Sequence, residues 1–202
     1  DTAEMKKPFS LVREELEAIQ DRLKEIEDEQ IELGEQLEKI EKDDVNARQK
    51  VTIYANKLHT IKRFMEKRNL PGIPESFLTI FFGASDYIEE LARELEATRV
   101  NIESVNRWLE ILANTMNELE EETYRIVRNS TLTEQLLQYS NRYRSFDDNV
   151  QAAFNESLHA FEVEFDYAKS LEIISKALDV VEPGVSARFI SSYEKTRENI
   201  RF

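Results

Sequence analysis

Residues 9–65 read FSLVREELEAIQDRLKEIEDEQIELGEQLEKIEKDDVNARQKVTIYANKLHTIKRFM, and the spacing of their apolar side chains decides the fold. Alternating steps of three and four residues give the register Phe9, Val12, Leu16, Ile19, Leu23, Ile26, Gln30, Leu33, Leu37, Ile40, Asp44, Ala47, Val51, Tyr54, Leu58, Ile61 and Met65. An unbroken seven-residue repeat predicts one supercoiled helix over about 9–68, because a straight helix would drift about 20° per heptad away from it. At about 1.5 Å per residue the helix would be about 85 Å long. Its seam must be buried by further helices, and we expect Asp44 within it to be hydrated or paired.

A turn and a second helix follow. Residues 69–74, Asn-Leu-Pro-Gly-Ile-Pro, end the first helix because neither proline continues a helix and Gly72 permits a turn. The second helix is predicted over 75–128 with a break near Gly83, after which Ser85 or Asp86 would act as an N-cap. Its strict register is Ile88, Leu91, Leu95, Thr98, Ile102, Val105, Leu109, Leu112, Met116, Leu119, Thr123 and Ile126.

A third helix is predicted over 132–182, starting from the capping-box pattern of Thr131 and Glu134 and ending at Pro183. A last short helix, from about 186 to 201, carries Phe189, Ile190 and Tyr193. Short connections between long helices make neighbours antiparallel. The sequence therefore predicts an all-α fold, an elongated antiparallel three-helix bundle over residues 1–182, with 183–202 packed on it.

Composition excludes several function classes. The 202 residues carry a formal net charge of −14, which repels phosphate backbones and anionic headgroups, so we expect no nucleic-acid partner and no membrane-surface binding. The absence of cysteine rules out disulfides and thiolate metal sites. No apolar run approaches the roughly 20 residues of a transmembrane helix. Because the chain begins with Asp1, we expect a fragment, with any membrane anchor lying upstream of it.

The sequence gives little support for a catalytic function. The two histidines, His59 and His159, lie on different predicted helices, which disfavours a histidine-based hydrolase or metal site. Glu156 and His159 match the Glu-x-x-His motif of di-iron bundles, but that fold needs a second motif and none surrounds His59. The runs of glutamate are typical of solvated helix faces. We therefore expect no enzyme activity, no catalytic residue, no cofactor, no metal and no small-molecule substrate.

One segment differs from the acidic background. Residues 137–145, Leu-Gln-Tyr-Ser-Asn-Arg-Tyr-Arg-Ser, join two tyrosines and two arginines to two amides. On a helix, the side chains at 138, 141, 142 and 145 would share a face, and tyrosine and arginine are enriched in binding hot spots. The residues alone leave two interpretations open, a protein-docking patch and an ordinary polar face beside two core tyrosines. The candidate docking residues are Gln138, Tyr139, Asn141, Arg142, Tyr143 and Arg144.

The same segment carries a family resemblance. Gln-Tyr-x-Asn-Arg-Tyr-Arg over residues 138–144 resembles the glutamine–asparagine–arginine patch near the C-terminal end of EzrA, the septation ring formation regulators of Gram-positive bacteria. Further similarity is found in Tyr87-Ile-Glu-Glu-Leu, in Val105-Asn-Arg-Trp108, in the aromatic run 154–165 and in the ending 192–202. The resemblance covers the whole chain and corresponds to roughly the C-terminal third of the family.

The resemblance implies a fold and a role. EzrA proteins have one N-terminal transmembrane helix and a cytoplasmic arc of spectrin-like three-helix repeats. They restrain assembly of the tubulin-like FtsZ polymer, and they connect the division ring to the membrane and to wall-synthesis proteins. The implied partners are FtsZ and other division proteins, and the implied location is the cytoplasmic face of the membrane at the mid-cell septum. The patch is associated with mid-cell localisation, a role that passes to Gln138, Asn141 and Arg142, and less directly to the tyrosines and Arg144.

Two other binding or structural classes compete with a division-ring adaptor. A purely structural spectrin-like spacer would act through stiffness and would tolerate every surface substitution. A membrane-bending bundle of the BAR type would need a cationic face, and the predicted second helix is acidic along its length.

Overall fold

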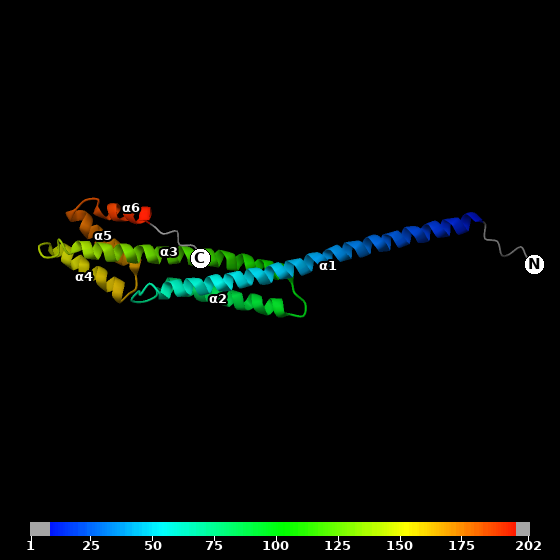
Figure 1. Ribbon diagram of the computed structural model, residues 1–202, viewed down its shortest axis with the longest axis horizontal. Helices are drawn as coiled ribbons and strands as arrows, with labels where there is room; N and C mark the ends of the chain where they lie inside the picture. Colours follow the sequence, from blue (N-terminus) through cyan, green and yellow to red (C-terminus); the bar gives the residue numbers. More distant parts are fainter. Residues whose placement is uncertain (1–8, 197–202) are drawn as a thin grey trace, which may run out of the picture. The chain divides into compact units, whose positions relative to one another are not determined.

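The computed structural model describes residues 9–196, and its side chains from Arg13 to Thr196. The fold is all-α, as predicted, and the described residues contain no β-strand. The helices are α1 (Phe9–Glu66), α2 (Glu75–Glu96), α3 (Ile102–Ser140), α4 (Asp148–Glu162), α5 (Tyr167–Val181) and α6 (Val185–Thr196) (Figure 1). The chain divides into two units, up to Arg48 and from Gln49 onward, and each is described separately. None of the described helices is long and apolar enough to cross a membrane.

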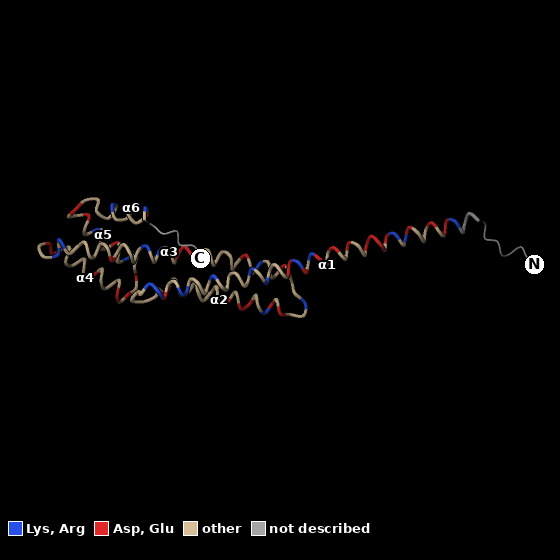
Figure 2. Tube along the Cα trace, viewed as in Figure 1, with Lys and Arg blue, Asp and Glu red and all other residues tan. Residues whose placement is uncertain are grey.

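The first unit is the N-terminal part of α1, whose continuity confirms the long helix read from the heptads. Its apolar seam is exposed over the stretch 16–40, where the predicted bundle would bury it. The seam residues concerned are Leu16, Ile19, Leu23, Ile26, Leu33, Leu37 and Ile40. Asp44 is paired, as expected, because Arg48 one turn later donates from Nε to its Oδ2 at 3.1 Å. Acidic and basic residues alternate along this part of the helix (Figure 2).

The second unit begins with the last turns of α1. Here the seam is covered, with Leu58, Ile61 and Met65 all buried. The chain reverses at Asn69, which adopts a left-handed φ of 54°, and α2 and α3 then pack side by side. Lys57 of α1 forms an ion pair with Glu120 of α3, so the helices on either side of α2 are also linked directly.

The second half of α3 supports the remaining helices. In Figure 1, α4, α5 and α6 gather around this end of α3, and α4 packs most extensively on α5. The core that they share consists of Leu132, Leu136, Leu137, Val150, Leu171, Ile174, Leu178 and Val185. At the α4–α5 interface, Ser157 and Ser170 are fully buried, and each hydroxyl donates to the other residue's backbone carbonyl at 2.7 Å. Such small side chains let the two helices approach closely.

The predicted break in α2 is wrong. The helix runs without interruption through Gly83, and residues 85 and 86 lie inside it, so they cap nothing. The real break comes at 97–101, where the predicted register continued without a gap. There Asn101 caps α3 by accepting from the backbone N–H of Ser104 at 3.1 Å. Leu95 and Val105 are buried on either side of this loop, so the seam stays in phase although the helix stops.

The boundaries predicted for the third helix are also wrong. Residues 129–131 lie within α3, where the hydroxyls of Ser130 and Thr133 donate to backbone carbonyls of the preceding turn. The stretch 132–182 is divided among the end of α3, α4 and α5, because aspartates start two new helices. Asp147 caps α4 and Asp166 caps α5, each accepting backbone N–H groups. The predicted terminal helix corresponds to α6, which begins at Val185 and packs on α3 and α5; its predicted continuation past 196 lies outside the described residues.

Candidate protein-docking site

The predicted patch spans the last turn of α3 and the following loop. Because α3 ends at Ser140, the patch residues do not share the helical face that was expected. Gln138, Asn141 and Arg142 are exposed and line one groove all the same, since Asn141 caps the helix and the loop continues in tight turns. Ser145, the fourth member of the expected face, is not part of that groove.

Glu182, which follows α5, holds the two tyrosines of the patch. The hydroxyls of Tyr139 and Tyr143 both donate to its Oε2 at 2.6 Å. Arg188 of α6 donates to Oε1 of the same carboxylate and to the Tyr139 hydroxyl, both at 3.0 Å. Two parts of the chain that are distant in sequence are thus joined at one carboxylate: the end of α3 with the loop after it, and the α5–α6 turn with the start of α6.

These bonds change the protonation of the carboxylate and of one tyrosine. The hydroxyls of Tyr139 and Tyr143, then Arg188, lower the pKa of Glu182 from 4.5 to about 2 against the opposing effect of desolvation. The hydrogen bond to Glu182, together with desolvation, raises the pKa of Tyr143 from 10.0 to about 12. At neutral pH the carboxylate is therefore charged and the phenol neutral, the forms that the hydrogen bonds require.

The two arginines of the patch stack on aromatic rings. The guanidinium of Arg142 lies 4.0 Å from the ring centre of Tyr139, and its Nη1 donates to the hydroxyl of that tyrosine at 3.0 Å. Arg144 lies 3.5 Å from the ring centre of Phe154, and its side chain donates to Asn141 and Gln151 at 2.8 and 3.0 Å. Arg144 thus fixes the loop onto α4, whereas Arg142 is exposed beside the groove.

The groove has two walls. One is formed by the end of α3 and the loop after it, and the other by α6, where the Phe189 ring packs edge-on against Tyr139 at 5.1 Å. Its volume is about 610 Å³, within the range of pockets that hold small molecules. Its lining consists of Gln135, Gln138, Tyr139, Asn141, Arg142, Phe189 and Ser192. None of these residues is acidic, so the groove can offer amide, guanidinium and aromatic groups to a binding partner.

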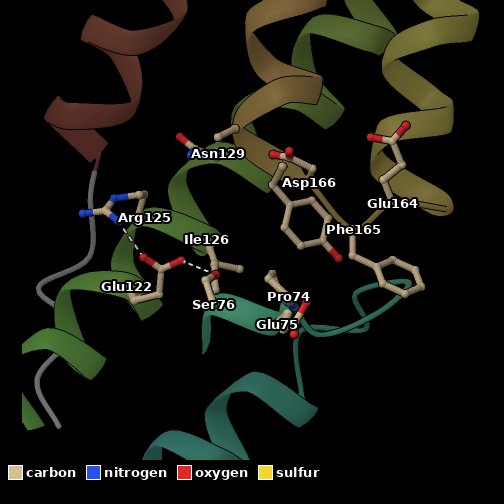
Figure 3. Close-up of a pocket in the computed structure, with 12 residues that line it drawn as sticks. Pro74, Glu75, Ser76, Glu122, Arg125, Ile126, Asn129, Glu164, Phe165 and Asp166 are labelled. Carbon is tan, nitrogen blue, oxygen red and sulfur yellow. Dashed lines mark hydrogen bonds and ion pairs between the residues drawn. The ribbon is translucent and has the colours of Figure 1, made fainter. Parts of the chain in front are cut away.

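A second cavity of about 380 Å³ lies where the loop before α2 meets the α4–α5 turn (Figure 3). There Glu122, which is 9% exposed, accepts from Ser76 at 2.8 Å and from Arg125 at 2.7 Å. Of the acidic side chains that line this cavity, Glu122 is therefore already hydrogen-bonded. Among the described residues, no group of three or more His, Asp or Glu side chains could hold a metal ion. The candidate histidines, His59 and His159, lie on α1 and α4.

At the same junction, the ring of Phe165 lies close to Gly72. Phe165 adopts a left-handed φ of 55°, and Figure 3 shows its ring turned toward the loop before α2. A Cβ added at Gly72 would lie 2.5 Å from three carbons of this ring. Tyr167 donates from its hydroxyl to the Gly72 carbonyl at 2.6 Å. Glycine is therefore required by the close approach of the ring.

Sequence reasoning missed Glu182, Arg188, Phe189 and Ser192. They lie more than a helix away from the patch in sequence, and no local motif connects them to it. The one available signal is that Glu182 directly precedes Pro183 and Gly184, so its position next to a turn was foreseeable. Its pairing with two tyrosines of α3 depends on the way α5 folds back.

Comparison with known proteins gives consistent matches. A family model described as "Septation ring formation regulator, EzrA" matches residues 1–193. Septation ring formation regulator EzrA of Streptococcus sanguinis (strain SK36) is 79% identical over 202 residues, 100% of this chain and 35% of that protein. The protein of the same name from Streptococcus gordonii is 68% identical over the same 202 residues, again 35% of its length. That of Streptococcus pneumoniae (strain Hungary19A-6) is 63% identical over 194 residues, 96% of this chain and 34% of that protein.

The chain thus spans about a third of the length of the curated relatives that it matches. Their shared name is that of a regulator of septation, and it names no enzyme activity. No solved structure matches the chain.

Proposed function

Because the chain belongs to the EzrA family of septation ring formation regulators, we propose that it is a docking segment of a cell-division regulator. In this proposal a division protein binds the groove between the end of α3 and α6, and the rest of the chain positions that groove. The proposal rests chiefly on the groove itself, which combines Arg142, Tyr139 and exposed amides on a chain otherwise dominated by acids. Arginine and tyrosine contribute disproportionately to binding energy.

The proposed partners and location come from the family. The main partner would be FtsZ, whose ring formation the full-length protein would restrain by competing for the polymer surface. A transmembrane anchor upstream of this chain would hold the protein on the cytoplasmic face of the membrane at the septum. It would thereby link the division ring to the membrane and to the septal machinery.

The proposed architecture is spectrin-like. The end of α1, α2 and the first half of α3 would make one three-helix group, and the second half of α3 would make another with α4 and α5. The contacts of α2 and α5 with α3 and the ion pair between Lys57 and Glu120 support this arrangement. The assignment of 1–182 as one such domain, with 183–202 packed on it, stays a prediction.

Two substitutions in the groove test the docking role. Arg142→Glu and Asn141→Ala change exposed side chains, so both variants should keep wild-type helicity, and the lost contacts with Tyr139 and Arg144 should lower the melting temperature by no more than about 2–4 °C. If these residues are hot spots, binding of FtsZ to the purified chain should weaken at least tenfold, and full-length protein should lose mid-cell recruitment. Arg107→Glu is the matched control, because it reverses an exposed arginine on α3 outside the groove.

The alternative is a structural spacer without a docking patch. It predicts that all three variants bind and localise like the wild type, while a change in the packed interior, such as Leu109→Asp, abolishes function through unfolding. Normal recruitment of both groove variants would therefore reject the docking role and favour the spacer.

A further inference from the structure

The charge of the groove is opposite to that of the chain. With 41 acidic and 27 basic residues, the protein as a whole is strongly acidic, yet all seven groove residues are neutral or basic. The acids beside it are already engaged. Glu182 accepts from two tyrosines and from Arg188, and Glu194 of α6 pairs with Arg128 at 3.4 Å. Charges farther away than about 8 Å are largely screened at physiological salt. Because the charged Glu182 offsets its ion-pair partner Arg188, the net positive charge at the groove is that of Arg142.

The polar groups of the groove suit an extended main chain. Gln135, Gln138 and Asn141 line one wall with amides, which can both donate and accept hydrogen bonds. An extended peptide exposes backbone N–H and C=O groups that need such partners, whereas a helix has already paired its own. The side-chain oxygen of Asn141 accepts from Arg144, so its N–H groups are the part of this amide left to bond a ligand.

The aromatic groups provide an apolar position. Tyr139 and Phe189 meet edge-on at 5.1 Å from the two walls, and both line the groove. The guanidinium of Arg142 lies over the Tyr139 ring at 4.0 Å. Beside them the guanidinium of Arg142 has N–H donors beyond the one used on Tyr139, in a planar array that matches a carboxylate.

We propose that this groove binds an acidic, extended peptide segment of a partner protein, with a carboxylate at Arg142 and an apolar side chain against the Tyr139–Phe189 pair. The inference rests on the proposed docking function and adds the chemistry of the partner. It also assigns α6 a direct part in binding, through Phe189 and Ser192, that the patch on α3 alone does not contain.

Ser192 allows a test by charge. It is exposed on α6 and lines the groove, so Ser192→Lys and Ser192→Glu should leave folding unchanged while adding opposite charges to the site. Relative to the wild type, Ser192→Lys should bind an acidic peptide about two- to fivefold more tightly and Ser192→Glu should bind it more weakly by a similar factor, the range of one exposed ion pair. Ser191→Lys and Ser191→Glu are the matched controls, because Ser191 is equally exposed on α6 but lies outside the groove.

The peptide is obtained without assuming its sequence. A display library of random decapeptides is selected on the immobilised full chain and counter-selected on the Arg142→Glu chain. The enriched peptides should be acidic with at least one apolar residue. Affinities of the most enriched peptide for the wild type and the four serine variants are then measured by fluorescence anisotropy.

The outcomes separate this inference from the docking function. Any of four results would overturn the acidic-peptide proposal. The selection could enrich basic peptides, or show no enrichment over the Arg142→Glu chain. The substitutions at 191 and 192 could change the affinity equally, or Ser192→Glu could bind the acidic peptide more tightly than Ser192→Lys. If recruitment still fails in Arg142→Glu, the docking function stands and the partner binds by different chemistry. If recruitment is normal in the groove variants while acidic peptides follow the predicted order, the peptide site stands and the docking function falls.

Discussion

Replacing Gly72 with alanine tests the contact that joins the loop before α2 to the α4–α5 turn. The new Cβ would lie 2.5 Å from three ring carbons of Phe165, whereas carbon atoms in contact are about 3.5–4.0 Å apart. The ring must therefore retreat by about 1 Å, and Phe165 already occupies a left-handed backbone conformation that restricts its adjustment.

The size of the effect follows from two opposing terms. Overpacking of this kind costs about 1–3 kcal/mol, and the lower entropy of the unfolded alanine chain returns about 0.4–1 kcal/mol. We expect a net destabilisation of about 1–2 kcal/mol, or a fall in melting temperature of about 2–8 °C for a chain of this size. Urea unfolding followed by far-ultraviolet circular dichroism measures the first quantity, and a thermal scan measures the second.

Gly83→Ala is the matched control, with an effect of opposite sign. Gly83 lies inside α2, and a Cβ there would meet nothing within 4 Å, so alanine should stabilise the protein by about 0.5–1 kcal/mol. In a Phe165→Ala background, Gly72→Ala should cost nothing further, because the ring that clashes is gone. If Gly72→Ala proved as stable as Gly83→Ala, or if the double variant lost the sum of both single effects, the close contact would not exist in solution.

Three further predictions concern hydrogen bonds of buried and half-buried side chains. Ser157→Ala or Ser170→Ala should each cost about 1 kcal/mol in urea unfolding. The double variant should cost less than the sum, because the two hydroxyl oxygens lie 2.9 Å apart and are coupled; strict additivity would contradict this contact. The stability contributed through Glu182 should be complete above pH 4.5 and lost as the pH falls toward about 2, because its folded pKa is lowered. The contribution through Tyr143 should be complete below pH 10 and lost as the pH rises through about 12, because its folded pKa is raised. Glu182→Gln should flatten the acid limb of a pH–stability curve and Tyr143→Phe the alkaline limb, and unchanged limbs would reject these assignments.

The sequence predicted long helices better than it predicted their ends. The heptad pattern of α1 and the Pro-Gly turn after it were sufficient, because both depend on local chemistry. The loop at 97–101 was missed because Leu95 and Val105 keep the seam in phase across it, so periodicity alone does not register the interruption. Asn101 was the available signal, as an N-cap residue between two apolar stretches.

The opposite error arose at residues 129–131, where polar residues suggested a loop. Ser130 and Thr133 satisfy their hydroxyls on carbonyls within α3, so the helix tolerates them in a buried position. The caps at Asp147 and Asp166 were overlooked because the apolar positions continue past them. The left-handed Phe165 could not be predicted, since phenylalanine rarely adopts that conformation and tertiary packing imposes it.

In the candidate site, too, local features could be predicted from the sequence and long-range contacts could not. The residue types of the patch singled out this segment, and Gln138, Asn141 and Arg142 line one groove, while their role in docking stays a prediction. The second wall could not be predicted, because it depends on α5 and α6 returning to the end of α3. Its central contact, Glu182 with two tyrosines, joins residues about 40 positions apart by long-range folding.

The two walls of the groove are synthesised at different times. A ribosome releases the end of α3 well before it releases Phe189 and Ser192, so a nascent chain carries the first wall without the second. The groove is completed among the last segments of this chain to emerge. Translation that stops within α5 would therefore yield a product that has every patch residue from Gln138 to Arg144 and still lacks the finished groove.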